Sequence, residues 1–255
     1  MISSKILGVL ELSNYKINWE VLEMNAWLDD VSNPEGYNLN SMLKRIKEAY
    51  DKYLKGTTTI GITCTDGVVL ATDRRVTSGY YIAHKRGKKI YIIDKHVAAT
   101  VAGVVADAQK LVDQLSAEAR LYRIENNRPM NVKAIATLAS NILLRARPSI
   151  LIVQILLGGV DESEGATLYN IDWFGTITKE KFTATGSGYS VAIGVLEEGY
   201  HDGITVNEAI PLAIRAVHSA MLRDTGSGEG IDVAVITKEG CKLLSDNEVK
   251  RYLSK

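Results

Sequence analysis

The sequence is poor in the residues that form covalent staples and metal sites. Its 255 residues include only two cysteines, Cys64 and Cys241, and four scattered histidines. Two cysteines form neither a disulfide framework nor a zinc cluster. We therefore expect a protein of a reducing compartment, the cytoplasm, that holds no metal.

Long apolar runs and a charge excess of either sign are absent as well. The longest apolar stretch, residues 150–160, is interrupted by Gln154, Gly158 and Gly159 and is shorter than the about 20 residues that cross a bilayer. Lysine and arginine number 30, and aspartate and glutamate also number 30, whereas a nucleic-acid-binding protein has a basic excess. The sequence therefore predicts neither a membrane partner nor a nucleic-acid partner.

Several common catalytic motifs are also missing. There is no phosphate-binding G-x-x-x-x-G-K-[ST], no H-E-x-x-H, no C-x-x-C and no G-x-S-x-G. A nucleotide-binding interpretation of residues 226–230, Gly-Ser-Gly-Glu-Gly, is weak because they lack the strand-then-helix context of a phosphate cradle. The sequence gives no sign of a cofactor.

The character of the chain changes at Gly56. Residues 1–56 hold three glycines and two of the three tryptophans, Trp19 and Trp27, and show little β pattern. Apolar residues at helical spacing predict a helix over 38–55 that ends at Gly56. We interpret residues 1–56 as an appended segment and residues 57–255 as the main domain.

After Gly56, strand patterns and helix patterns follow each other in blocks. Strands are predicted at 57–64, 68–77, 88–94, 96–103, 150–157, 167–172, 181–187 and 231–238. Helices are predicted at 108–122, 135–143, 191–196 and 205–221, with a short terminal one capped by Ser245 and Glu248. Asn131 is expected to cap the second helix, and Thr205 with Glu208 the fourth. Pro211 predicts a kink in the fourth helix or a later start.

The order of these elements indicates the α+β class, because strands, two helices, strands, two helices and a strand do not alternate one by one. Two antiparallel sheets stacked face to face, each covered outside by a helix pair, would bury every apolar stripe. The predicted fold is therefore a four-layer αββα sandwich.

Two charged residues interrupt the buried strand pattern. Asp73 ends one apolar strand and Lys89 begins another. Taken alone, each is typical of a solvated strand end. As a pair they would form a partly buried ion pair that lowers the pKa of the carboxyl. The Gly-Ser turns at 185–188 and 224–228 are typical of loops, although such turns also present amides and hydroxyls to ligands.

The segment from Thr57 to about Lys238 resembles the β-type subunits of the 20S proteasome, of the archaeal kind. The resemblance begins at Thr-Thr-Thr-Ile-Gly and continues through Asp-Gly-Val-Val-Leu-Ala-Thr-Asp-Arg-Arg and Gly-Lys-Lys-Ile-Tyr. Further ordered blocks lie at residues 101–109, 156–161, 185–188 and 231–236. The match covers nearly the whole chain after the appended segment.

This resemblance implies an N-terminal nucleophile hydrolase fold and a threonine endopeptidase that degrades unfolded polypeptides. It implies that the protein cuts its own Gly56–Thr57 bond, so that residues 1–56 are a propeptide and residues 57–255 are the catalytic domain. Carried over by position, Thr57 is the nucleophile and Asp73 and Lys89 are its charged partners. The amide of Gly103 is the oxyanion donor, and the supporting polar residues are Ser187, Asp224 and Ser227.

The chemistry of such a site has a physical basis. A hydroxyl is a weak nucleophile until a base takes its proton. An α-amine has a pKa of about 7.7–8.0 and is a better base at neutral pH than a lysine near 10.4. Thr57 can supply both hydroxyl and amine only once its bond to Gly56 is broken, while Lys89 stays an ammonium beside Asp73.

The same alignment implies an S1 pocket without charge, lined by Val76, Gly87, Tyr91, Val101 and Val105. An uncharged pocket predicts a chymotrypsin-like preference for cleavage after large apolar residues. Spacing alone would equally place these five residues in an ordinary core.

The resemblance also implies partners. They are other β subunits in a heptameric ring that is stacked on a second one, flanking α-subunit rings, and indirectly an ATP-dependent unfoldase. A ring of one β subunit and a mixed ring both remain open. So do a long leader and a translation start at Met42. The competing functions are a catalytically silent ring subunit and a small-molecule amidase of the same fold, although Cys64 lies too far inside the first strand to act as its nucleophile.

Overall fold

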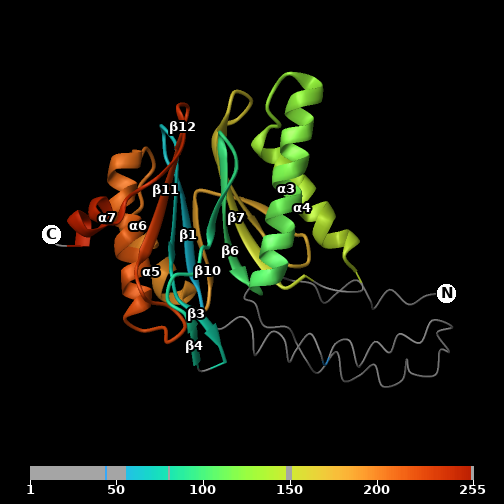
Figure 1. Ribbon diagram of the computed structural model, residues 1–255. Coiled ribbons are helices and arrows are strands. Elements are labelled where there is room, and N and C mark those ends of the chain that lie inside the picture. Colours follow the sequence, from blue (N-terminus) through green and yellow to red (C-terminus); the bar gives the residue numbers. More distant parts are fainter. Residues whose placement is uncertain (1–43, 45–55, 80, 148–150, 254–255) are drawn as a thin grey trace, which may run out of the picture. The chain divides into compact units, whose positions relative to one another are not determined.

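The computed structural model describes residues 44, 56–79, 81–147 and 151–253 (Figure 1). The chain divides into two units, Met1–Glu48 and Ala49–Lys255, and the architecture below is that of the second unit. The helix predicted over 38–55 lies outside the described residues, apart from Lys44, which is helical.

The first of two five-stranded sheets has the order β10-β1-β2-β11-β12, with every neighbouring pair antiparallel. Its strands are β1 (Thr58–Thr63), β2 (Val68–Asp73), β10 (Phe182–Gly186), β11 (Ile231–Thr237) and β12 (Gly240–Leu243). A tight turn joins β1 to β2, where a side chain on Gly67 would meet the carbonyl oxygen of Ile236 at 2.3 Å. Because the strands are antiparallel, the start of β1 lies beside the C-terminal ends of β2 and β10, at one end of the sheet.

The second sheet has the order β5-β6-β7-β8-β9 and is also antiparallel throughout. Its strands are β5 (Ile90–Asp94), β6 (Val97–Gly103), β7 (Val153–Asp161), β8 (Gly165–Ile171) and β9 (Ile177–Glu180). A separate hairpin, β3 (Val76–Ser78) and β4 (Tyr81–His84), lies between β2 and β5 in the chain.

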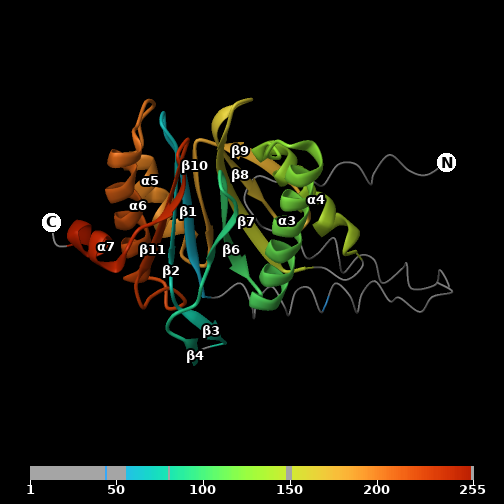
Figure 2. The ribbon, with the colours of Figure 1, turned by 45° about the horizontal axis from the view of Figure 1, so that its top comes forward.

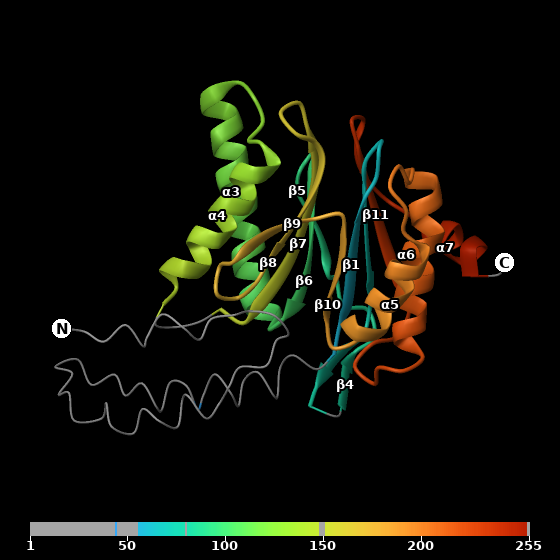
Figure 3. The same ribbon diagram turned by 180° about the vertical axis from the view of Figure 1, so that it is seen from behind.

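Helices cover the outer face of each sheet, so the predicted four-layer αββα sandwich is confirmed (Figures 1 and 2). Helices α3 (Val105–Asn126) and α4 (Val132–Arg145) lie on the second sheet. Helices α5 (Tyr189–Gly199) and α6 (Val206–Met221) lie on the first, with α7 (Asp246–Leu253) beside α6. Figure 3 shows the same layers from behind. None of the described helices is long and apolar enough to cross a membrane.

Apolar side chains fill the three spaces between these layers. In β2, Val69 and Ala71 pack toward α6, whereas Val68 and Leu70 pack toward the second sheet. This division follows from the alternation of side chains along a strand. A third cluster, which includes Leu111, Ile135 and Leu157, lies between the second sheet and its helices.

Several predicted elements differ in detail. The single strand predicted at 68–77 ends at Asp73, because the N–H groups of Arg74 and Arg75 both donate to the carbonyl oxygen of Gly228. Three short strands, β4, β9 and β12, were not predicted, because they have too few residues to show a period.

The helix caps give a mixed outcome. Asn131 occupies the N-cap position of α4, but its side chain does not cap the helix, and the Asp161 carboxylate accepts from the Val132 N–H instead. The capping box of Thr205 and Glu208 is confirmed, and so is the terminal cap of Ser245 and Glu248.

Pro211 does not delay the start of α6. The helix begins at Val206 and contains Pro211 near its N-terminus, so the alternative of a later start is wrong. A proline here removes the hydrogen bond to the Asn207 carbonyl. Asn207 is exposed, and water can satisfy that oxygen.

Candidate active site

Asp73 is the last residue of β2, and each of its two carboxylate oxygens accepts two hydrogen bonds. Its Oδ1 accepts from the Lys89 ammonium at 2.7 Å and from the Thr58 N–H at 2.9 Å. Its Oδ2 accepts from the N–H groups of Arg75 and Gly228, each at 2.9 Å. Four N–H donors favour an ionised carboxylate, although its side chain is fully buried.

Lys89 stands just before β5 and reaches across to the same point. Its Nζ donates to Asp73 and also to the carbonyl oxygen of Gly56 at 3.3 Å. The Lys89 side chain is 7% exposed, so the ion pair is shielded from water. The pair predicted from the interrupted strand pattern is therefore formed, and it points at the Gly56 carbonyl.

Burial acts on both members of this pair. It raises the pKa of the Asp73 carboxyl above its ordinary value, although Lys89 and the N–H groups of Thr58 and Gly228 act in the opposite direction. Burial likewise lowers the pKa of Lys89, against the attraction of Asp73. The ion pair acts on the Asp73 pKa in the expected downward direction, but desolvation by burial outweighs it, so the net shift is upward.

The Gly56–Thr57 peptide lies in the middle of these groups. The Thr57 hydroxyl donates to the Gly56 carbonyl oxygen at 2.6 Å. Gly56 has φ +130°, and a side chain on it would meet the Thr77 hydroxyl oxygen at 2.1 Å, so only glycine fits there. The hydroxyl of Thr57 is thus placed beside the carbonyl group of the bond that precedes it.

Two serine hydroxyls and one carboxylate form a hydrogen-bonded network that contacts the same peptide through its N–H groups. The N–H groups of Gly56 and Thr57 donate to Ser187 Oγ at 3.1 and 3.3 Å. Ser187 in turn donates to Asp224 Oδ2 at 2.6 Å, and Ser227 donates to the same oxygen at 2.6 Å. The two Gly-Ser turns therefore meet at the Gly56–Thr57 peptide.

The next residue, Thr58, has a different environment. Its hydroxyl lies 2.6 Å from Ser227 Oγ, in a hydrogen bond that the sequence analysis did not predict. Thr58 is fully buried, whereas Thr57 is 9% exposed. Of the two threonines, Thr57 alone lines the cavity described next.

A cavity of about 710 Å³ opens beside the Gly56–Thr57 peptide. Gly103, at the end of β6, lines it with φ +127°, and a side chain there would lie 2.2 Å from the Ile152 carbonyl oxygen. All five residues of the expected apolar pocket line this cavity together with Thr57 and Lys89: Val76, Gly87, Tyr91, Val101 and Val105.

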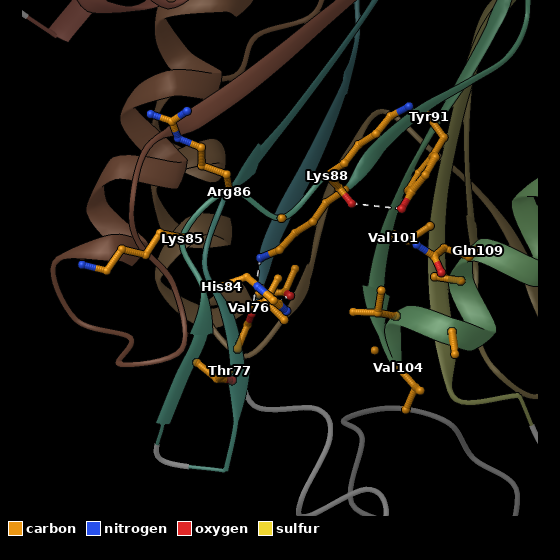
Figure 4. A pocket seen from close by; sticks show the side chains of 18 residues that line it. Val76, Thr77, His84, Lys85, Arg86, Lys88, Tyr91, Val101, Val104 and Gln109 are labelled. Atoms are coloured by element: carbon orange, nitrogen blue, oxygen red, sulfur yellow. Dashed lines mark hydrogen bonds between the residues drawn. The ribbon is translucent and has the colours of Figure 1, made fainter.

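The mouth of the cavity carries basic residues that the sequence analysis did not place there. His84, Lys85, Arg86 and Lys88 are among its lining residues, and no aspartate or glutamate is. Figure 4 shows that Lys85 and Arg86 point away from the cavity, whereas His84 lies close to Val76. The Lys88 ammonium lies 5.0 Å from the centre of the Tyr91 ring. The run His-Lys-Arg-Gly-Lys-Lys at 84–89 was the available signal.

The other chemistry-bearing residues lie elsewhere. Burial raises the pKa of the Cys64 thiol to about 12 and that of Cys241 to about 12, so neither is an activated nucleophile. Within the described part of the chain, no group of three or more histidine, cysteine or acidic side chains could hold a metal ion.

Comparisons with known proteins agree with this geometry. The family described as "Proteasome subunit" matches residues 53–236, which is more than half of the chain. The chain belongs to the proteasome subunit family. Proteasome subunit beta 1 of Pyrobaculum aerophilum is 56% identical over 198 residues, covering 77% of this chain and 98% of the relative.

Relatives from other archaea are similar to the same extent. Proteasome subunit beta of Methanothermobacter thermautotrophicus is 55% identical over 201 residues, covering 78% of this chain and 95% of the relative. That of Methanosarcina mazei is 52% identical with the same coverage. The chain is therefore an archaeal-type proteasome β subunit, a threonine-type endopeptidase with the N-terminal nucleophile hydrolase fold.

Proposed function

We propose that this β subunit cuts its own Gly56–Thr57 bond and then uses Thr57 as its nucleophile. Residues 1–56 would then be a propeptide and residues 57–255 the catalytic domain. The observation that carries the proposal is the Thr57 hydroxyl, 2.6 Å from the Gly56 carbonyl oxygen, with the Lys89 ammonium 3.3 Å from the same oxygen. Both groups therefore contact the carbonyl oxygen of the peptide that the proposal breaks.

The self-cleavage has two balanced steps. The Thr57 Oγ attacks the Gly56 carbonyl carbon, a C–O bond forms, the C–N bond breaks, and the hydroxyl proton passes to the Thr57 nitrogen. Water then hydrolyses the ester, which leaves Gly56 with a carboxylate and Thr57 with a free amine. Lys89 stabilises the negative charge that develops on the Gly56 oxygen, and Ser187, hydrogen-bonded to Asp224, lies beside the Thr57 nitrogen.

In the mature chain, the free amine of Thr57 takes the proton from its own hydroxyl. The oxygen attacks the substrate carbonyl carbon, the peptide C–N bond breaks as the amine returns its proton to the leaving nitrogen, and water hydrolyses the acyl-enzyme. The Gly103 N–H stabilises the tetrahedral oxyanion, a contribution of roughly 3–4 kcal/mol in comparable sites. Asp73 holds the Lys89 ammonium, and Ser187, Asp224 and Ser227 orient the amine.

Two threonines are adjacent, and the contacts favour Thr57 over Thr58. The Thr58 hydroxyl is hydrogen-bonded to Ser227, and its backbone N–H is hydrogen-bonded to Asp73. A nucleophile must reach a substrate, and Thr58 does not line the cavity. We therefore assign Thr58 a structural role.

N-terminal sequencing and intact mass of the purified protein test this assignment. Wild type is expected to begin Thr-Thr-Thr-Ile-Gly, and Thr57→Ala is expected to keep residues 1–56 and to lose all peptidase turnover. Thr58→Val, which keeps the shape of the side chain, is the matched control and is expected to be cut still before Thr57. A cut between Thr57 and Thr58, abolished in Thr58→Val, would assign the nucleophile to Thr58. Wild type that retains Gly56 would indicate a catalytically silent subunit.

The cavity favours cleavage after large apolar residues. Its walls present Val76, Tyr91, Val101 and Val105, and no aspartate or glutamate is among its lining residues. A P1 arginine or lysine would bring a further positive charge toward these basic residues. In a panel of fluorogenic peptides, we expect the highest kcat/KM after Leu, Tyr or Phe. Faster cleavage after Arg or Asp would contradict the proposed preference.

We also propose that the subunit assembles in the cytoplasm. Cys64 and Cys241 are free thiols, as expected for a reducing compartment. We propose that the subunit forms a heptameric ring that stacks on a second one between α-subunit rings, with unfolded polypeptides as substrates that an ATP-dependent unfoldase delivers. Its relatives are proteasome β subunits by name. Co-expression with an α subunit should give stacked rings by negative-stain electron microscopy, and single subunits alone would contradict the assembly.

A further inference from the structure

Arg75 lies just after Asp73 and makes contacts that the catalytic assignment does not use. Its Nη1 donates to the Thr225 carbonyl oxygen at 2.8 Å, and its Nη2 lies 3.2 Å from Glu229 Oε1. These two acceptors lie at either side of the segment Gly226-Ser227-Gly228. One planar guanidinium therefore spans the loop 224–229 by two separate hydrogen bonds.

The guanidinium lies directly against this loop. A side chain on Gly228 would sit 2.4 Å from the Arg75 Nη2 and 2.5 Å from its Cζ, so the group packs on the Gly228 backbone. The Gly228 N–H also donates to Asp73, and its carbonyl accepts from the Arg75 N–H at 3.1 Å. Arg75 thus ties the loop to the end of β2 through both its side chain and its backbone.

The other side of the same loop lies against Gly56, the residue that precedes the bond to be cut. A side chain on Gly226 would lie 2.4 Å from the Gly56 Cα and 2.5 Å from the Gly56 nitrogen. The loop also carries Asp224, whose Oδ2 accepts from Ser187 and Ser227. The position of the loop therefore determines where Gly56 sits and how Ser187 meets the Thr57 nitrogen.

The loop has little stiffness of its own. Gly226, Gly228 and Gly230 alternate with other residues, and glycine leaves the backbone the widest choice of conformations. Glu229 adopts φ +69°, a left-handed conformation that is unfavourable for a residue with a side chain. An external contact has to hold such a segment in place, and the Glu229 carboxylate is bonded to Arg75.

We propose that Arg75 is a positioning residue, and that its bridge to Thr225 and Glu229 presses the loop 224–229 against Gly56 for self-cleavage. This inference rests on the proposed cut at Gly56–Thr57. Before the cut, Thr57 has an amide nitrogen and no amine base, so the reaction depends on the placement of Gly56 between Thr57, Ser187 and Gly226. After the cut Gly56 has left, and the free amine supplies the base. Loss of Arg75 therefore slows self-cleavage more than peptide hydrolysis.

The test compares full-length variants at two neighbouring arginines. Arg75→Gln removes the bridge. Arg74→Gln is the matched control, because Arg74 has the same 22% side-chain exposure but pairs with Asp232 and Asp246 instead of the loop. The fraction of chains that still carry residues 1–56 is followed over time by intact mass, and kcat and KM are then measured on the processed chains.

We expect Arg75→Gln to slow self-cleavage by about tenfold or more, since hydrogen bonds from a charged donor are lost. Its kcat should fall less, and its KM should stay within about twofold of wild type, because Arg75 does not line the cavity. Arg75→Lys should be intermediate, because an ammonium lacks the two-pronged geometry of the guanidinium. Glu229→Gln should slow self-cleavage less than Arg75→Gln, because a neutral acceptor remains.

The outcomes separate the inference from the proposed function. Wild type that is never cut at Gly56–Thr57 overturns the proposed function. Wild type that is cut, with Arg75→Gln cut at the wild-type rate or slowed no more than Arg74→Gln, overturns the inference alone. If Arg75→Gln does not fold, Arg75→Lys and Glu229→Gln are used in its place. Self-cleavage at the wild-type rate in both of these variants would also overturn the inference.

Discussion

Asp73 and Lys89 depend on each other because neither is stable alone in its surroundings. Burial raises the pKa of Asp73 and lowers the pKa of Lys89, so desolvation disfavours the charged form of each. Removing one partner of a buried pair leaves the other charge uncompensated and costs about 3–5 kcal/mol, whereas replacing both can be nearly neutral.

This asymmetry gives a prediction for the pair. Asp73→Asn and Lys89→Met should each lower the free energy of unfolding by about 3–5 kcal/mol and stop self-cleavage. The double variant Asp73→Asn with Lys89→Met should recover most of that stability and still not be cut. Denaturant unfolding and intact mass measure the two effects. Single variants as stable as wild type, or a double variant that cuts itself, would contradict this account.

A site residue could be predicted from the sequence only where it interrupts the pattern of its neighbours in the chain. Asp73 ends one buried strand, and Lys89 and Thr57 each directly precede another, so pattern and resemblance together found them. The hydrogen bond from Thr58 to Ser227 and the bridge from Arg75 to Glu229 connect positions 169 and 154 residues apart. No spacing in the sequence predicts such contacts, because they arise only when β1, β2 and the loop 224–229 meet.

At the scale of elements, strand interiors were easier to predict than strand ends. Both faces of β1 and β2 are buried, and the resulting runs of apolar and β-branched residues are visible in the sequence. The end of β2 is instead set by the Gly228 carbonyl, which takes two N–H groups from the chain that follows Asp73. The cap of α4 was misassigned for a similar reason, since its acceptor comes from Asp161, a residue of β7.

Asp161 is therefore expected to stabilise α4 from a distance in the chain. Its Oδ2 accepts from the Val132 N–H at 2.7 Å, and its Oδ1 accepts from Ser163 and the Glu164 N–H. Although burial opposes them, these hydrogen bonds hold the pKa of the Asp161 carboxyl below its ordinary value. The stabilisation is thus present above the unfolded pKa near 4 and is lost as pH falls through the lower folded pKa.

Asp161→Asn should accordingly lower the free energy of unfolding by about 1 kcal/mol at pH 7. The difference from wild type should shrink as the pH falls below about 4, because the unfolded wild type then takes up a proton at Asp161, and it is lost once the pH passes the lower folded pKa. Glu162→Gln, an exposed neighbour, is the control and should change little at either pH. Denaturant unfolding at pH 7 and at pH 3 measures the effect, and a constant difference at both would contradict it.

At the scale of the whole catalytic unit, the layers were predictable and the cavity was only partly so. Each sheet buries both faces, so the apolar stripes required two sheets and two helix pairs, as observed. The cavity needs more, since it is built from the β3–β4 hairpin, the segment before β5, β6 and the start of α3. The residues of its apolar wall could be predicted from the family resemblance. Its basic mouth could not, because it depends on the path of residues 84–89 between β4 and β5.

The basic mouth predicts that the enzyme favours acidic peptides at low salt. With a fixed P1 leucine, peptides with glutamate in the preceding positions should show a higher kcat/KM than those with lysine. The ratio should approach one near 1 M salt, where the screening length is about 3 Å. Lys88→Gln should reduce this ratio. Lys238→Gln, in the β11–β12 turn and outside the cavity lining, should leave it unchanged. A preference for lysine, or a ratio insensitive to salt, would show that the mouth does not steer substrates.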